Sequence, residues 1–372
     1  MRKDKFYLKL QHLLSFADVN INGDNPWDIQ VHNGKFFPRV LAEGSLGLGE
    51  AYMDRWWDCA RLDEFVYRVL RADLESRIKP WKEYWAHLNA KCFNLQNRSL
   101  AFRNGQHHYD IGNDLYQCML DKLLIYSCGY WKNASSLDEA QEAKLDLVCR
   151  KLQLEPGFRV LDIGCGLGGT AKFMAEHYQA DVVGITVSKN QAAFAKKFCR
   201  GLPVDIRLED YRSLNGTYDR IVCIGMFEHV GYKNYKTFMG IVRKHLKDNG
   251  LFLLQTIGGN LSVNKIDPWM RRYIFPNAML PSARQVSAAI EKCFVLEDWH
   301  NFGMDYAKTL MHWFKNFDTS WNNLKENYSE RFYRMWKFYL LSCAGTFRAR
   351  INQLWQIVLS PTGFSCGYCA PR

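Results

Sequence analysis

The segment at residues 160–169, VLDIGCGLGG, combines an apolar strand pattern with a glycine-rich turn and the start of a helix. Glycine allows positive φ values and lets a ligand approach the backbone, so this unit is typical of folds that bind a nucleotide at a helix N-terminus. From residue 158 onward, strand patterns alternate with segments of helical length. The predicted strands lie at residues 159–163, 182–186, 206–208, 220–224 and 251–256. Because these runs are almost continuously apolar, we expect helices on both faces of a parallel, doubly wound sheet, an α/β fold.

The glycine turn alone does not identify its ligand. Dinucleotide-binding folds use a related turn, followed about 20 residues later by an acid that binds the ribose. Here the second predicted strand ends in Thr186. The acid at the end of the first strand, Asp162, and the GCG arrangement instead resemble motif I of class I S-adenosylmethionine-dependent methyltransferases. The resemblance implies that the loop holds the methionine part of this cofactor and that Asp210 contacts the adenine, although Asp210 could also be a solvated acid at a strand end.

The length of 372 residues is enough for two ordinary domains, and we expect two. Residues 6–17 carry apolar side chains at helical spacing, and residues 27–94 are rich in aromatic residues and glycine turns. A polar stretch separates this region from the motifs downstream. We therefore predict a small mixed domain at residues 1–95, a linker at 96–107 and a catalytic domain at 108–372. The helix at 6–17 either faces the core or lies on a membrane.

Composition limits the compartment and the partners. No apolar run approaches the roughly 20 residues of a membrane-spanning helix, so we expect neither a spanning helix nor a signal peptide. The twelve scattered cysteines fit a reducing cytoplasm, and Cys366 and Cys369 lack a second ligand pair for zinc, so no metal is expected. The formal charge of +11 favours an anionic partner or serves solubility. Nucleic acid is not expected, because the sequence has no base-recognition motif.

Further strings occur outside the glycine loop. They are EGSLGLGE at 43–50, HYDIGNDL at 108–115, YSCGYW at 126–131, GMFEHVG at 225–231 and FRAR at 347–350. With these strings the chain resembles the cyclopropane-fatty-acyl-phospholipid synthases from about residue 19 to residue 359. The resemblance implies a class I methyltransferase, Rossmann-like sheet, a smaller N-terminal α+β domain that binds lipid, an acyl-chain-binding insertion at about 259–282 and a homodimer. It also implies a cytoplasmic enzyme, peripherally associated with the inner face of the cell membrane, that acts on unsaturated phospholipid acyl chains.

The reaction implied by this resemblance moves a methylene group from S-adenosylmethionine to a cis double bond. The site has to align the alkene with the sulfonium methyl, shield the resulting carbocation and provide a base that removes a proton as the ring closes. In the family this base is a bicarbonate ion. The resemblance places the bicarbonate site at Cys128, Glu228, Gln255, Ile257 and Tyr306. It places the cofactor contacts at Tyr126, Ser127, Asp162, Gly164, Gly166, Gly168, Thr186, Gln191, Asp210 and Tyr211.

Two positions depart from the family pattern, and two other functions stay open. Gln255 stands where a histidine is expected, and an amide can donate a hydrogen bond to an anion but cannot become cationic. Leu167 replaces a tryptophan that is common in the glycine loop. Cys128 could be a nucleophile, but a sulfonium electrophile makes a covalent acyl intermediate unnecessary, so anion binding or packing is the preferred interpretation. The open alternatives are methylation to methyl-branched acyl chains and lipid binding without catalysis.

Overall fold

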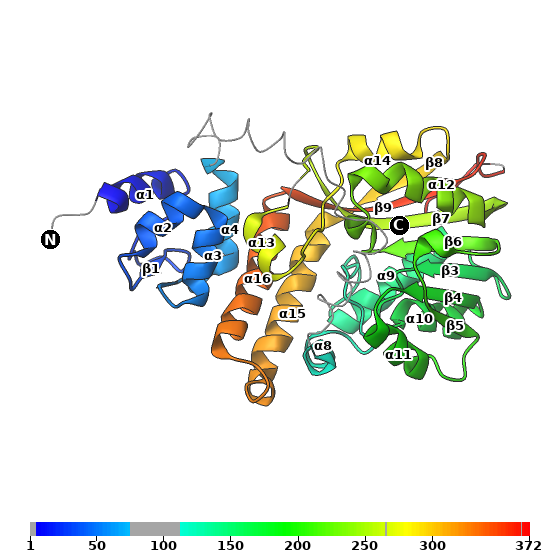
Figure 1. The fold of residues 1–372 in the computed structure, drawn as a ribbon, viewed down its shortest axis with the longest axis horizontal. Coiled ribbons are helices and arrows are strands. Elements are labelled where there is room, and N and C mark those ends of the chain that lie inside the picture. The colour runs from blue at the N-terminus through cyan, green and yellow to red at the C-terminus, as the bar shows by residue number, and fades with distance from the viewer. Residues whose placement is uncertain (1–4, 75–111, 265, 366) are drawn as a thin grey trace. The chain divides into compact units, whose positions relative to one another are not determined.

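The computed structural model describes residues 5–74, 112–264, 266–365 and 367–372, which form two compact units (Figure 1). The sheet unit is drawn from Asn94–Lys265, Asn277–Thr309 and Gln353–Arg372. The N-terminal unit is drawn from Met1–Phe93, Ile266–Pro276 and Leu310–Asn352. Each unit is therefore built from segments that are far apart in the sequence.

A seven-stranded sheet with the order β5-β4-β3-β6-β7-β9-β8 organises the sheet unit. Its strands are β3 (Arg159–Ile163), β4 (Asp181–Thr186), β5 (Val204–Leu208), β6 (Tyr218–Ile224), β7 (Leu246–Gly259), β8 (Val295–Asn301) and β9 (Asn352–Ser360). Strands β3 to β7 pair in parallel, whereas β8 and β9 pair antiparallel. The strand order reverses at β3, which has β4 on one side and β6 on the other. In open α/β sheets this reversal leaves a crevice at the carboxyl ends of the strands.

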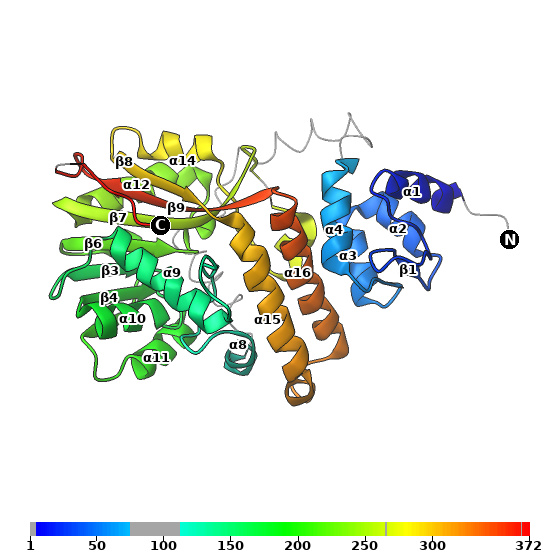
Figure 2. The same ribbon diagram turned by 180° about the vertical axis from the view of Figure 1, so that it is seen from behind.

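Helices cover both faces of the sheet, because alternate residues of each strand point to opposite sides. On one face Leu161 and Ile163 of β3 share a core with α12 (Tyr235–His245) and α14 (Ala283–Ile290). On the other face Val160 packs with α9 (Leu137–Lys151) and α10 (Gly169–Tyr178). Figure 2 shows α9 lying over the face that is turned away in Figure 1. The remaining elements of this unit are α8 (Asn113–Met119), α11 (Lys189–Phe198), η1 (Tyr211–Ser213), η2 (Phe227–His229) and η3 (Tyr232–Asn234).

The prediction of a parallel, doubly wound α/β sheet is confirmed. Each of the five predicted strands lies within one of the strands β3 to β7, and the first coincides with β3. The two strands at the far edge, β8 and β9, were not predicted. They form an antiparallel pair with a register shift between Leu296 and Asp298, and β8 carries exposed and half-buried residues rather than a continuous apolar run. The edge strand β8 therefore has a weaker sequence pattern than a central parallel strand, whereas β9 lies between β7 and β8 and is almost fully buried.

The N-terminal unit is a mixed α+β unit with an aromatic core. It contains α1 (Lys5–Ser15), β1 (Gln30–Val31), α2 (Phe36–Glu43), α3 (Ser45–Met53), β2 (Trp57–Asp58), α4 (Leu62–Arg71), α13 (Pro268–Tyr273) and α16 (Glu330–Arg348). Trp57 is fully buried among Phe36, Tyr52, Phe65 and Phe338, with ring centroids 5.2–6.5 Å from its own. Aromatic rings at such distances add specific edge and face contacts to their large buried area. Helix α15 (Gly303–Leu324) belongs to the sheet unit up to Thr309 and to the N-terminal unit from Leu310.

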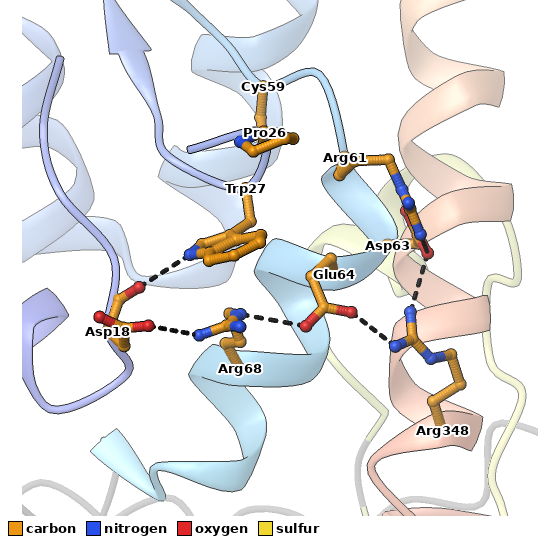
Figure 3. Close-up of polar contacts among 9 residues, drawn as sticks. All are labelled: Asp18, Pro26, Trp27, Cys59, Arg61, Asp63, Glu64, Arg68 and Arg348. Atoms are coloured by element: carbon orange, nitrogen blue, oxygen red, sulfur yellow. Dashed lines mark hydrogen bonds and ion pairs between the residues drawn. The ribbon is translucent and has the colours of Figure 1, made fainter. Parts of the chain in front are cut away.

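An ion-pair network holds α16 to α4 within the N-terminal unit (Figure 3). Arg348 donates to Asp63 at 2.8 Å and to Glu64 at 2.5 Å. Arg68 continues the network from Glu64 to Asp18, at 3.0 and 2.8 Å. The carboxylates Asp63 and Glu64 are largely buried, and such pairs are worth more than surface ion pairs when both partners stay in place. The FRAR string therefore contributes an arginine to the N-terminal unit.

This arrangement differs from the predicted division at residues 95 and 108, both of which lie outside the described residues together with the predicted linker at 96–107. The prediction assigned everything from residue 108 to one catalytic domain. In the structure α13 and α16 instead pack with the N-terminal helices, and α13 is part of the predicted insertion at 259–282. The physical reason is that α13 and α16 make close aromatic contacts and ion pairs with the N-terminal helices. Trp269 of α13 lies against Gly49, where an added Cβ would come within 2.4 Å of the indole.

Candidate active site

The glycine turn follows β3 directly and leads into α10. Gly164, Gly166 and Gly168 have φ values of +83°, +55° and +91°, which side-chain-bearing residues rarely adopt. A Cβ on Gly164 would also come within 2.7 Å of Met226, whereas a Cβ on Gly166 would meet no atom of the described residues within 4 Å. The turn lies at the carboxyl end of β3, where the strand order reverses. The backbone of this loop is therefore accessible at the expected position of a ligand.

The other predicted cofactor contacts follow the neighbouring strands. Thr186, at the end of β4, donates to Gln191 of α11 at 2.8 Å, and both side chains are buried. Asp210, after β5, is 3% exposed and forms an ion pair with Arg212 at 3.0 Å, so it is not a solvated acid. The hydroxyl of Tyr211 is buried beside Arg212, and burial raises its pKa to about 12. These side chains form part of one edge of the sheet.

Glu228 provides a buried carboxylate after β6. Its Oε1 accepts a hydrogen bond from the Ile257 amide at 2.6 Å, and in the described part of the chain its Oε2 has no partner. Burial raises the pKa of Glu228 to about 7, although the Ile257 amide acts in the opposite direction. The predicted backbone donor to the anion, the Ile257 N–H, is thus engaged by Glu228 in this structure. A buried polar atom without a partner needs an explanation, and a small polar ligand is one.

Gln255 lies two residues before Ile257 on β7, and a second buried amide orients it. Its Oε1 accepts from Gln356 Nε2 at 2.9 Å, and the side chains are 1% and 0% exposed. Gln356 lies on β9, the strand next to β7 in the sheet. The Nε2 group of Gln255 has no hydrogen-bond partner within the described ranges. Gln356 was not predicted, because its partner lies 101 residues away in the sequence.

Cys128 is bound by Thr309 of α15, and Tyr306 lies on the same helix. Thr309 donates to Cys128 Sγ at 3.9 Å and accepts from the Gly129 amide at 3.1 Å. Tyr306, 8% exposed, is one helical turn before Thr309. Burial, followed by the nearby Asp305 charge, raises the pKa of the Cys128 thiol well above its usual range. The thiol is therefore neutral, which argues against a nucleophilic role.

The five predicted anion-site residues thus fall into two groups, each with its own contacts. Glu228, Gln255 and Ile257 lie after β6 and at the carboxyl half of β7, whereas Cys128 and Tyr306 are linked through the first turns of α15. Sequence patterns had not indicated Thr309, Asp305 or Gln356. Asp305 accepts from the Trp131 amide at 2.7 Å, across 174 residues of sequence. Across the ranges the structure describes, there is no group of three or more metal-ligating side chains, and Cys366 lies outside those ranges.

Comparison with known proteins identifies the family. A sequence model described as mycolic acid cyclopropane synthetase matches residues 96–357. The chain is also 54% identical over 358 residues to the cyclopropane-fatty-acyl-phospholipid synthase of Escherichia coli (strain K12), covering 96% of this chain and 94% of that protein. The chain belongs to the mycolic acid cyclopropane synthetase family. The family match begins at residue 96, whereas the similarity to the E. coli protein is long enough to include most of the N-terminal unit.

Two further relatives show the breadth of the cyclopropane synthetase family. The crystal structure of mycolic acid cyclopropane synthase CmaA1 complexed with SAH and CTAB superposes with a TM-score of 0.65 at 32% identity, covering 69% of this chain and 97% of that chain. Sphingolipid C9-methyltransferase A of Emericella nidulans is 35% identical over 282 residues, or 71% of this chain and 54% of that protein. With the observed strand order, these similarities confirm the predicted class I methyltransferase fold.

Proposed function

We propose that this chain transfers a methylene group from S-adenosylmethionine to the cis double bond of an unsaturated phospholipid acyl chain, closing a cyclopropane ring with bound bicarbonate as the base. The similarity to the E. coli synthase over 96% of the chain supports the substrate class. The structural observation that carries the proposal is a pair of buried polar atoms, Glu228 Oε2 and Gln255 Nε2, that have no hydrogen-bond partner among the described residues. One can accept a hydrogen bond and the other can donate one, which matches an anion that has both an O–H group and charged oxygens.

The residues at the carboxyl edge of the sheet fit S-adenosylmethionine, which supplies an electrophilic sulfonium methyl when bound. The positive φ values of Gly164, Gly166 and Gly168 keep the loop backbone accessible. Tyr211 contributes a buried hydroxyl beside Arg212 at the same edge of the sheet. Because the Cys128 thiol stays neutral, it does not compete with the alkene for the methyl group. These properties favour transfer to a weak carbon nucleophile.

Aromatic side chains near Cys128 are suited to shielding a carbocation. Phe302 and Tyr306 are both 8% exposed, and the Tyr130 ring meets Phe302 edge-on at 5.4 Å. The faces of aromatic rings are electron-rich and exclude water. Bicarbonate, when bound, supplies the base for ring closure. Glu228 would orient it by accepting its O–H, and Gln255 would donate to one of its oxygens.

Bicarbonate dependence tests this assignment, and Gln255→His tests the role of the amide. Depletion of bicarbonate with CO2-free buffer is expected to lower the rate of the wild-type protein by about 100-fold or more, the size typical of a lost general base. In Gln255→His, protonation of the imidazole as pH falls from 8 to 6 adds a positive charge beside the anion. The bicarbonate concentration for half-maximal rate should therefore fall with pH in the variant more than in the wild-type protein.

Both arms are measured as initial rates of product formation, titrated with bicarbonate at pH 6, 7 and 8. Gln255→Glu serves as the opposite control, because a carboxylate would repel the anion and raise the concentration required. Equal rates with and without bicarbonate would contradict its role as the base. Identical pH profiles for Gln255→His and the wild-type protein would contradict the role of Gln255.

We further infer that the N-terminal unit contacts the membrane surface peripherally. Helix α1 turns Leu10, Leu13 and Leu14 to the core, while Phe6 and Leu8 are 44% and 54% exposed. Two lysines on the helix, Lys5 and Lys9, are exposed beside them. Basic and apolar side chains on one exposed helix are typical of binding to an anionic lipid surface. None of the described helices is long and apolar enough to span a bilayer.

The double substitution Lys5→Glu/Lys9→Glu is expected to weaken binding to vesicles of anionic phosphatidylglycerol, measured by co-sedimentation, at least about 30-fold at low salt, because each lysine contributes about 1 kcal/mol near such a surface. The effect should shrink in 0.5 M salt. A matched control, Lys196→Glu/Lys197→Glu, makes the same charge change at exposed positions of α11 and should leave binding near the wild-type value. Equal losses in the two double variants would show that net charge, rather than α1, governs binding.

A second candidate reaction keeps the cofactor and gives a methyl-branched chain instead of a ring. The similarity to sphingolipid C9-methyltransferase A favours this alternative, whereas the buried Glu228 and Gln255 groups favour ring closure. A lipid-binding role without catalysis is disfavoured, because the glycine loop and the Glu228 carboxylate are both formed. The homodimer stays a prediction, which sedimentation equilibrium can check.

A further inference from the structure

Helix α9 carries buried polar side chains on the side that faces the interior of the sheet unit. Gln141 and Lys144, three residues apart and therefore on one side of the helix, are both 0% exposed. A buried lysine is uncommon because an isolated ammonium group loses a large hydration energy. No sequence motif had marked either residue. Their hydrogen-bond partners show which segment these two side chains hold in place.

Both side chains bind Ser127, which lies between the predicted cofactor contact Tyr126 and Cys128. Gln141 Nε2 donates to the Ser127 carbonyl oxygen at 2.7 Å. Lys144 Nζ donates to the Ser127 hydroxyl at 3.1 Å. The main chain and the side chain of one residue are thus held from one helix. These hydrogen bonds fix the orientation of the Ser127 segment, and all three residues are buried.

Lys144 also balances the charge of Asp162 at the end of β3. Asp162 alternates with Leu161 and Ile163, so it points to the same face of the sheet as Val160, the face that α9 covers. Burial raises the pKa of Asp162 to about 7, and the Lys144 charge acts against this rise. Burial lowers the pKa of Lys144 to about 8, opposed by Asp121, Cys128, Asp162 and Cys149. The Lys144 charge thus acts on Asp121, which precedes the Ser127 segment, and on Asp162, which precedes the glycine loop, without an ion pair to either among the described residues.

We propose that Lys144, supported by Gln141, is a positioning residue of the cofactor site: it holds the Ser127 segment in place, and its charge acts on Asp162 near the end of β3. The inference rests on the proposed binding of S-adenosylmethionine at these two segments. Lys144 acts through Ser127 and Asp162 rather than on the cofactor itself. Its loss therefore weakens cofactor binding more than it weakens the fold.

Lys151 offers a matched control on the same helix. It is also 0% exposed, and it pairs with Asp298 at 3.0 Å. Lys144→Met and Lys151→Met each remove a buried ammonium group of α9 and replace it with a side chain of similar length. Both variants are expected to lower Tm. Only Lys144→Met should raise the Kd for S-adenosylhomocysteine, measured by calorimetry, at least about 10-fold at pH 7, a shift equivalent to about 1.4 kcal/mol.

The pH dependence provides a readout that a purely structural role would not give. As pH rises through 8, Lys144 loses its charge in the wild-type protein, so the ratio of the Lys144→Met Kd to the wild-type Kd should shrink. Gln141→Met tests the same contact without removing a charge and should weaken binding about three- to 10-fold, even if Lys144→Met fails to fold. Equal Kd values for Lys144→Met and Lys151→Met, or for Gln141→Met and the wild-type protein, would overturn the proposal. A wild-type protein that does not bind the ligand would overturn the proposed function as well.

Discussion

Replacing Glu228 with glutamine is expected to lower kcat by about 100- to 1,000-fold, the range seen when a preorganised polar group at a reaction centre is removed. Glutamine keeps the size of the side chain and can still accept from the Ile257 amide, which now bonds to Oε1 at 2.6 Å. The atom at the second position changes in nature, because an amide nitrogen cannot accept the O–H of bicarbonate. The affinity for S-adenosylhomocysteine should stay within about twofold of the wild-type value, an effect well under 1 kcal/mol.

The same substitution should make the protein more stable at alkaline pH. Burial raises the pKa of Glu228 to about 7, above its value of about 4.5 in the unfolded chain. A carboxyl group with a raised pKa gives its full contribution to stability below about pH 4.5 and loses it as pH rises through 7. Glutamine does not ionise, so at pH 8 Glu228→Gln should increase the free energy of unfolding by about 1–3 kcal/mol. Thermal unfolding at pH 6 and pH 8 measures this difference.

An exposed carboxylate serves as the control for Glu228. Glu326→Gln changes the same chemical group at an exposed position and should alter neither kcat nor Tm beyond experimental error. A Glu228→Gln protein that keeps more than about a third of the wild-type kcat would contradict a direct role for the carboxylate. Lower stability at pH 8 would contradict its buried, raised-pKa state.

Gly166→Ala is expected to raise the Kd for S-adenosylmethionine by about 10- to 100-fold, or about 1.4–2.7 kcal/mol. The reason is direct obstruction. An added Cβ would meet no atom within 4 Å in the part of the chain that the structure describes, so the methyl group would project into the space that the cofactor is proposed to use. The backbone strain is modest, since alanine at a φ of +55° costs about 1–2 kcal/mol.

Gly157→Ala is the control that distinguishes backbone strain from obstruction of the cofactor. Its φ is +79°, and a Cβ there would also meet none of the described atoms within 4 Å, but Gly157 precedes β3 instead of following it. Gly157→Ala should therefore lower Tm about as much as Gly166→Ala while leaving the Kd unchanged. If calorimetry gave the same Kd for the two variants, the glycine loop would not be the cofactor loop.

The parts of the fold that the sequence predicts are those with a local signal. The apolar runs of β3 to β7 and the glycines at 164, 166 and 168 follow from patterns within a few residues. The contacts that complete the site are long-range. Thr309 binds Cys128 across 181 residues, and Gln356 binds Gln255 across 101. A lone threonine or glutamine in a helix or strand has no local feature that marks it as part of a site.

The same limit explains the predicted domain division. Helix α16 resembles any amphipathic helix, and only its packing shows that it belongs with α3 and α4. Gly345 makes this possible, since an added Cβ would lie 2.6 Å from the Asp63 carbonyl oxygen. Lys144 is a comparable case, because a lysine within a helical pattern is normally predicted to be exposed. In the structure it is fully buried against Ser127.

The central claim is tested most directly by incubating the purified protein with S-adenosylmethionine, bicarbonate and liposomes of cis-unsaturated phospholipid. The acyl chains are then analysed by mass spectrometry and by proton NMR. We expect an added mass of one carbon and two hydrogens, together with the high-field proton signals of a cyclopropane ring. The same added mass without ring signals, or no added mass while the protein still binds the cofactor, would contradict the proposed reaction.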